Sequence, residues 1–161
     1  MQKVYSQMSS PLRSAQVYAA EGRPAIIAPM HFNSAGIRYE QDNPVVMGST
    51  EWENIAPSLR SALARFSFRE ANLREGRLSD WPSYRASGLR SVRQFQHEYL
   101  CIWVIAINDA ELFYDAYCHP RGEADIALHV TLNPKGTDEE MSRILGRLFR
   151  ACLHWPAVMS E

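Results

Sequence analysis

The side chains best suited to metal or acid–base chemistry in this chain are five histidines and three cysteines, and they are widely spaced. The histidines are His31, His97, His119, His129 and His154. No two of them have the H-x-x-x-H spacing with which one helix face binds zinc, and no two cysteines have the CxxC spacing of a structural zinc site. The spacing therefore predicts no metal site, and we expect no cofactor.

One histidine has neighbours suited to acid–base chemistry. On the strand expected over residues 126–132, His129 lies on the polar face, where Asp115 or Tyr117 of the preceding strand could meet it. An imidazole beside a carboxylate occurs in hydrolase sites, so a small cytoplasmic hydrolase stays open as an alternative. The serines, however, form no G-x-S-x-G turn and the glycines form no phosphate loop. We therefore expect a binding protein and not an enzyme.

The distribution of charge is more informative than its total. The formal net charge is −1, which argues against a general binder of nucleic acids or anionic membranes. Residues 54–93 carry eight arginines against three acids, whereas residues 108–140 carry eight acids against one arginine and one lysine. Such a distribution can also mean only that the charged side chains are solvated, or that they pair with one another across the surface. Each exposed ion pair would then contribute only about 0–1 kcal/mol to stability.

Our functional hypothesis is an acidic patch that docks a basic protein. The patch lies on the expected strands and turns of residues 109–125 and consists of Asp109, Glu111, Asp115, Glu123 and Asp125. A cationic active site that holds RNA or DNA phosphates would be such a target. A second candidate contact is formed by Trp81 and Tyr84 beside Arg85, since these residue types are enriched in interface hot spots. The same aromatic side chains could equally hold their loop to the core.

Hydrophobic periodicity predicts the elements that position these residues. Residues 100–107 are apolar on both sides, which indicates a central strand, and residues 112–118 and 126–132 follow it as strands of an antiparallel meander. Residues 25–32, 36–40 and 44–47 are predicted as further strands. Thr50-x-x-Glu53 and Thr137-x-x-Glu140 are capping boxes, and each begins an amphipathic helix.

The remaining segments give weaker patterns. Residues 12–20 predict a short helix, residues 67–87 an irregular connection, and Ser91 the cap of another short helix. At 161 residues we expect one α+β domain, in which the three-stranded meander and the N-terminal strands form an antiparallel sheet packed against amphipathic helices. Residues 1–24 and 156–161 are expected to be less ordered.

The cysteines and the apolar segments indicate the compartment. Each cysteine lies in an apolar run, which predicts reduced, free thiols. The first thirty residues contain no uninterrupted apolar stretch of the kind found in secretory signals. The longest apolar run, LCIWVIAI, is less than half of the roughly 20 residues that cross a membrane. We expect a cytoplasmic protein that does not associate with membranes.

Several segments, taken in order, resemble a known protein family. They are PSYRASGLRSVRQF, Glu98-Tyr99 with the strand CIWV, NDAELFYDAYCHP, ADIALHVTL and TDEEMSRILGRLFRAC, with IIAPMHFNSAGIRYEQDNPVVMG upstream. Together they span most of residues 25–152. In this order they are similar to the immunity proteins of bacterial contact-dependent growth inhibition systems.

The resemblance implies an antidote inside the cell. Such a protein binds the toxic C-terminal domain of an incoming effector, often a nuclease, and blocks it stoichiometrically without enzymatic activity or cofactor. Family members neutralise different toxins, so the resemblance assigns no interface residue and no oligomeric state. The near-neutral charge departs from the acidic balance of many nuclease antidotes and leaves the toxin's chemistry open. An effector chaperone or assembly adaptor, which also binds a protein, is a further alternative.

Overall fold

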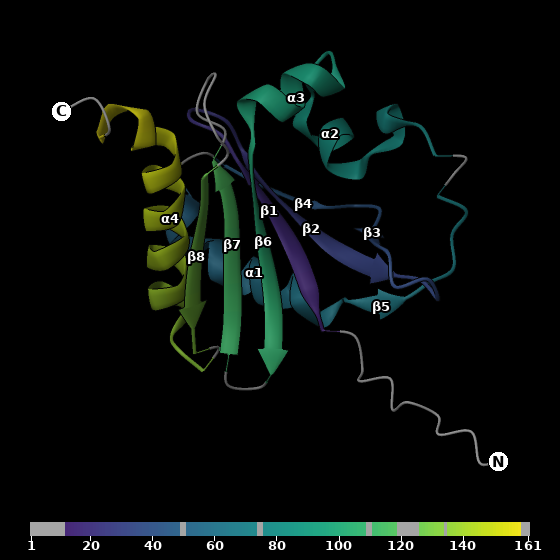
Figure 1. Ribbon diagram of the computed structural model, residues 1–161, viewed down its shortest axis with the longest axis horizontal. Coiled ribbons are helices and arrows are strands. Elements are labelled where there is room, and N and C mark those ends of the chain that lie inside the picture. The colour runs from purple at the N-terminus through teal and green to yellow at the C-terminus, as the bar shows by residue number, and fades with distance from the viewer. Residues whose placement is uncertain are drawn as a thin grey trace.

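The computed structural model describes residues 12–48, 51–73, 76–108, 111–118, 126–133 and 135–158. Its strands are β1 (Ser14–Ala19), β2 (Ala25–Phe32), β3 (Arg38–Glu40), β4 (Val45–Met47), β5 (Ser67–Phe68), β6 (Leu100–Asn108), β7 (Glu111–Cys118) and β8 (Ile126–Leu132). Its α-helices are α1 (Ile55–Ala64), α2 (Pro82–Ser87), α3 (Val92–Glu98) and α4 (Asp138–Val158). The strands form one sheet, with α1 and α4 on one face and α2 and α3 on the other (Figure 1). The α+β class predicted from the sequence is confirmed.

The sheet has the order β3-β2-β1-β6-β7-β8, and β4 and β5 pair with β2 as well. All pairings are antiparallel except that of β2 with β5. The predicted meander is confirmed as β6, β7 and β8. In its register Trp103 lies opposite Asp115, and Asp115 lies opposite His129. Because strand side chains alternate, these three residues share one face of the sheet.

The helix predicted over residues 12–20 is wrong, because Ser14–Ala19 forms the strand β1. This strand lies between β2 and β6 and is buried along its whole length. Its small and polar residues have low strand propensity, so pairing on both sides decides its conformation. Val17 joins the core on one face and Tyr18 the core on the other. Of the N-terminal segment that we expect to be less ordered, residues 1–11 lie outside the described residues.

The larger core fills the space between the sheet and the helices α1 and α4. The helix α4 runs alongside β8, and α1 crosses behind the sheet (Figure 1). Leu145 and Leu148 of α4 are buried, which confirms the predicted apolar stripe. The Thr137 hydroxyl accepts a hydrogen bond from the Glu140 N–H at 3.2 Å, as the capping pattern predicts.

The start of α1 differs from the prediction. The α-helix begins at Ile55, after the 3-10 turn Glu51–Asn54, whereas Thr50 lies outside the described residues. Pro57 is in the first turn of the helix. An N–H in that turn has no intrahelical partner, so the proline costs α1 no hydrogen bond.

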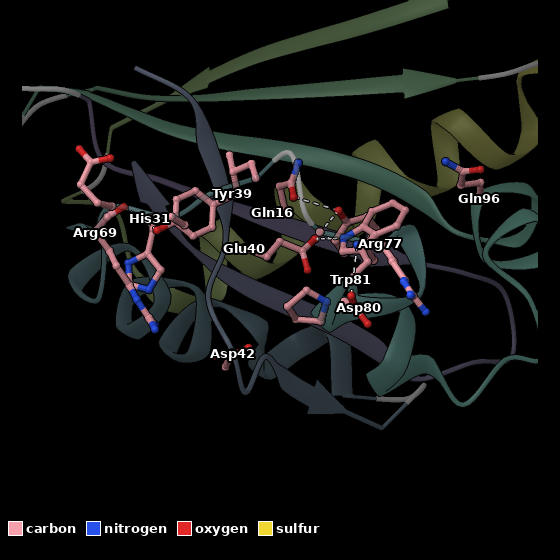
Figure 2. A pocket seen from close by; sticks show the side chains of 16 residues that line it. Gln16, His31, Tyr39, Glu40, Asp42, Arg69, Arg77, Asp80, Trp81 and Gln96 are labelled. Atoms are coloured by element: carbon pink, nitrogen blue, oxygen red, sulfur yellow. Dashed lines mark hydrogen bonds between the residues drawn. The ribbon is translucent and has the colours of Figure 1, made fainter. Parts of the chain in front are cut away.

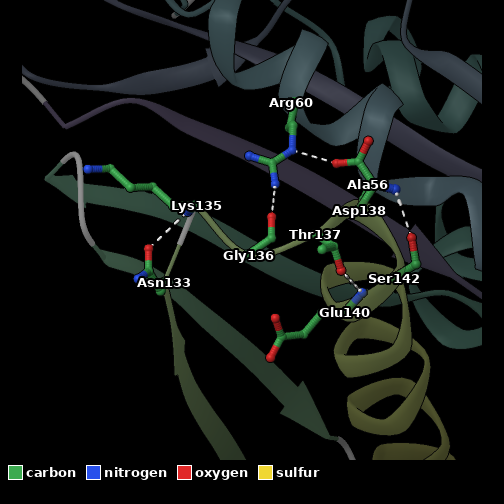
Figure 3. A network of polar contacts seen from close by, with 9 residues as sticks. All are labelled: Ala56, Arg60, Asn133, Lys135, Gly136, Thr137, Asp138, Glu140 and Ser142. Atoms are coloured by element: carbon green, nitrogen blue, oxygen red, sulfur yellow. Dashed lines mark hydrogen bonds and ion pairs between the residues drawn. The ribbon is translucent and has the colours of Figure 1, made fainter.

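Polar contacts hold α1 against α4 (Figure 3). The Arg60 guanidinium donates to Asp138 Oδ1 and to the Gly136 carbonyl oxygen, both at 2.6 Å. The buried Ser142 hydroxyl accepts a hydrogen bond from the Ala56 N–H at 3.2 Å, which satisfies a donor in the first turn of α1. Arg60 is therefore part of the helix packing and is not available to a partner.

The smaller core lies between α2, α3 and the strands β1 and β2. Phe95 is at its centre, and Ser91 caps α3 by accepting a hydrogen bond from the Gln94 N–H at 3.1 Å, as predicted. The irregular connection predicted for residues 67–87 is wrong in part, since it contains β5 and α2. The helix α2 has too few turns to show periodicity, although Pro82 at its start and the left-handed Gly88 at its end are helix boundary signals.

Candidate interaction site

One half of the sheet is covered by helices on one face only. The core around Phe95 reaches across β1 to Cys101 of β6 and includes no described residue of β7 or β8. On this side α2 and α3 lie at one end of the sheet, while α4 lies beyond β8 on the other side (Figure 1). The outer part of β6, β7 and β8 therefore presents a face without a helix in the described part of the chain. We call this the open face, formed by Trp103, Ile105, Phe113, Asp115, His129 and Thr131.

Three large apolar side chains lie on the open face: Trp103, Ile105 and Phe113. Each is partly exposed and none belongs to either core. Ile105 lies directly opposite Phe113, whose ring stacks on His129 at 5.4 Å between centroids. Contiguous apolar surface with polar neighbours is characteristic of interaction sites, and aromatic residues are enriched at interface cores.

The contact predicted between His129 and Asp115 is confirmed. His129 Nδ1 lies 3.2 Å from Asp115 Oδ1, and the side chains are 53% and 16% exposed respectively. The two side chains lie within ion-pair distance on the surface of the sheet, which is the pairing that the hydrolase alternative requires, although Asp115 Oδ1 accepts no hydrogen bond from a described residue. It also supplies polar groups at the border of the apolar patch.

The structure describes two members of the predicted acidic patch. Glu111 begins β7 and shares the open side of the strand with Asp115, since the two are four residues apart. Asp109, Glu123 and Asp125 lie outside the described residues. A binding role for these five carboxylates stays a prediction.

Trp81 and Tyr84 pack against the smaller core. Their ring centroids lie 5.0 Å and 6.2 Å from that of Phe95, and the Trp81 ring also meets Tyr18 at 5.7 Å. This is the anchoring role that the sequence left open. Both side chains remain partly exposed, so a contribution to binding stays a prediction.

A groove of about 830 Å³ lies beside the smaller core (Figure 2). Segments far apart in the sequence line it: β1, the ends of β2 and β3, residues 69–71, 73, 76 and 77, and the start of α2. Glu40 lies in the middle of this view, with His31, Tyr39 and Arg69 toward one end and Arg77 and Trp81 toward the other (Figure 2). No local sequence pattern predicts the groove, because its walls meet only in the folded chain.

Glu40 joins three elements around the groove. Its Oε1 accepts hydrogen bonds from the Tyr18 hydroxyl and the Trp81 indole N–H, both at 2.6 Å. Its Oε2 accepts one from the Ser83 backbone N–H at 2.9 Å, which satisfies an unpaired donor at the start of α2. Burial raises the pKa of Tyr18 above its usual range, so the phenol remains a donor. No sequence pattern points to this role, since Glu40 is one of two acids at a polar turn.

The Cys101 thiol is expected to react slowly with alkylating reagents in the folded protein. Burial raises its pKa from 9.0 to about 12, and the thiolate is the reactive form. Its contribution to stability is present below about pH 9 and is lost as the pH rises through about 12, because the unfolded thiol ionises first. Mass spectrometry after maleimide labelling at pH 8 measures this, with protein in urea as the control. Equal labelling rates in both states would contradict the burial of Cys101.

Cys101 and Cys152 form no disulfide in the described part of the chain, in agreement with the predicted reduced thiols, and the side chain of Cys118 lies outside the described ones. Among the residues described, no three His, Cys, Asp or Glu side chains are grouped so that they could hold a metal ion. None of the described helices combines the length and apolar composition needed to cross a membrane.

Comparison with known proteins finds likeness in structure. Neither protein-family models nor curated protein sequences give a match. A protein of unknown function from Neisseria meningitidis is similar with a TM-score of 0.63 and 18% identity, over 86% of this chain and 94% of that one. A chain of the CdiA-CT/CdiI toxin and immunity complex from Yersinia pseudotuberculosis is similar with a TM-score of 0.57 and 10% identity, over 81% and 91% of the two chains. At these identities the likeness establishes a shared fold.

Proposed function

We propose that this protein is an immunity protein that binds and neutralises the toxic C-terminal domain of a contact-dependent growth inhibition effector. The observation that carries the proposal is the fold shared with a chain of a toxin and immunity complex over 81% of the sequence. The sequence segments that resemble immunity proteins lead to the same function. The partner is accordingly a protein domain, and the protein acts by covering it.

The open face is suited to this task. A stable protein complex buries about 800 Å² on each partner, and a few central aromatic residues supply most of the affinity. Trp103, Ile105 and Phe113 give the open face such a centre. Asp115 and His129 add polar groups beside it, which can fix the orientation of a partner.

The proposal is tested by producing the protein together with the toxin domain of the effector encoded by the adjacent upstream reading frame. We expect cells that express the toxin domain to resume growth, and the purified proteins to form a 1:1 complex. A different immunity protein, expressed to the same level, is the control. Continued growth arrest without complex formation would overturn the proposal, and secretion of an unharmed client would identify an effector chaperone instead.

The contact between Asp115 and His129 favours a second candidate, a hydrolase in which His129 acts as the base. A panel of ester, phosphoester and peptide substrates tests it. Turnover that disappears in His129→Ala but persists in the exposed control Thr131→Ala would support the hydrolase. An immunity protein is expected to show no turnover with either variant.

A further inference from the structure

The groove lies beside the open face. Gln16 of β1 lines the groove, and its partner in the register of the sheet is Trp103 of β6. Directly opposed residues on antiparallel strands have side chains on the same face, about 5 Å apart at Cβ. A partner that covers Trp103 therefore also lies next to a residue that lines the groove.

Three of the four carboxylates that line the groove accept hydrogen bonds from the protein itself; Asp42 is the fourth. Glu40 accepts three hydrogen bonds, as described above. Asp80 accepts one from the Arg77 backbone N–H at 3.2 Å, and Glu70 accepts one from the Ser34 backbone N–H at 2.9 Å. These acids stabilise the walls of the groove and have less capacity left for a ligand.

The guanidinium groups of the groove have no side-chain partner among the described residues. Arg69 and Arg77 are exposed, and neither side chain forms an ion pair or hydrogen bond with any residue in the described ranges. Figure 2 shows the two side chains toward opposite ends of the groove. Within the described residues each guanidinium therefore keeps donors that match a carboxylate in a bidentate pair.

Aromatic surface lies between these two cations. The Tyr39 hydroxyl donates to the Arg69 carbonyl oxygen at 2.5 Å, which fixes its ring at one end of the groove. The Trp81 indole is held by Glu40 at the other. Fixed aromatic rings beside free arginines are the residue types of an interface hot spot, because they offer apolar area and charge at low entropic cost.

We infer that the groove binds an acidic segment of the toxin domain, with carboxylates of that segment paired to Arg69 and Arg77 and its apolar side chains against Tyr39 and Trp81. This inference rests on the proposed function. A nucleic acid fits the groove less well, because its unbroken row of phosphates would lie beside Asp42, Glu70 and Asp80. A peptide can instead place single carboxylates at the two arginines and uncharged residues beside these acids. The part of the toxin domain that enters the groove is thus acidic. The part that faces Asp115 on the open face can carry a different charge.

The test uses the double variant Arg69→Glu, Arg77→Glu and the purified toxin domain. We expect its dissociation constant to rise about 100-fold, because each reversal replaces an attraction with a repulsion. The matched control is Arg143→Glu, Arg147→Glu, which makes the same charge change at two exposed arginines of α4 on the other side of the sheet. We expect this control to bind within about threefold of the unmodified protein, since distant surface charges are screened. Circular dichroism confirms that both variants are folded.

The outcomes separate the inference from the proposed function. If the unmodified protein binds the toxin domain and the groove variant binds equally well, the inference is wrong and the proposed function stands. If the unmodified protein does not bind the toxin domain, the proposed function is wrong, and the inference that rests on it is wrong as well. Binding of a 20-nucleotide RNA at physiological salt that is lost only in the groove variant would also overturn the inference. Restored binding of the groove variant to a toxin domain in which one carboxylate is changed to arginine would confirm the pairing.

Discussion

Replacing Phe95 by alanine is expected to lower the free energy of unfolding by about 3–5 kcal/mol. Phe95 is 1% exposed and contacts the rings of Tyr18, Trp81, Tyr84 and Tyr99. These neighbours cannot easily move into the cavity that the alanine would leave. Tyr18 and Trp81 donate hydrogen bonds to Glu40, and the Tyr99 hydroxyl donates one to the Pro24 carbonyl oxygen. Urea unfolding followed by circular dichroism measures the loss.

Two further variants are the controls for Phe95→Ala. Phe95→Leu retains most of the volume, and we expect it to cost less than half as much. Arg93→Ala, at an exposed position of the same helix, is expected to change the free energy of unfolding by less than about 0.5 kcal/mol. A similarly small change for Phe95→Ala would mean that α3 is not held by this aromatic cluster.

Replacing Trp103 and Phe113 together by alanine is expected to weaken binding to the toxin domain by about 1,000-fold. The reason is that central aromatic residues each contribute about 2 kcal/mol or more to an interface. The effect on folding is expected to be much smaller than that of Phe95→Ala, because both side chains are partly exposed and belong to neither core. Isothermal titration calorimetry measures the affinity and urea unfolding the stability.

The control for this pair is Phe68→Ala. Phe68 is an exposed aromatic residue of β5, 55% accessible, whose ring packs against Phe32 and not on the open face. We expect its removal to leave the affinity within about threefold. If the Trp103 and Phe113 variant binds as tightly as this control, the open face is not the interface and the groove becomes the first surface to map.

The parts of the fold that were predictable from the sequence are those in which neighbouring segments decide the structure. The alternation of β7 and β8 defines which side chains share a face, so the meeting of Asp115 with His129 could be predicted. The caps at Ser91 and Thr137 act within three residues of the chain. Both kinds of feature have a spacing that can be read directly.

The parts that were missed depend on contacts between distant segments. The strand β1 is a strand because β2 and β6 pair with it, whereas its own residues favour neither state. Glu40 becomes the centre of the groove only when β1, β3 and α2 meet. The sequence shows that Arg69 and Arg77 belong to an arginine-rich segment. Only the fold shows that Arg60 of the same segment is paired with Asp138 of α4.

The layer formed by α2 and α3 has a consequence for the motions of the molecule. It comes from one contiguous segment, holds two helices of six and seven residues, and rests on β1 and β2 through the ring cluster and Glu40. Such a layer can open as a unit while the core under α1 and α4 stays closed. Its backbone amides are then expected to exchange hydrogen with solvent faster than those of β1 and β6. Because the same layer forms one wall of the groove, an occupied groove would slow this exchange, so deuterium uptake in residues 82–98 reports whether a partner is bound.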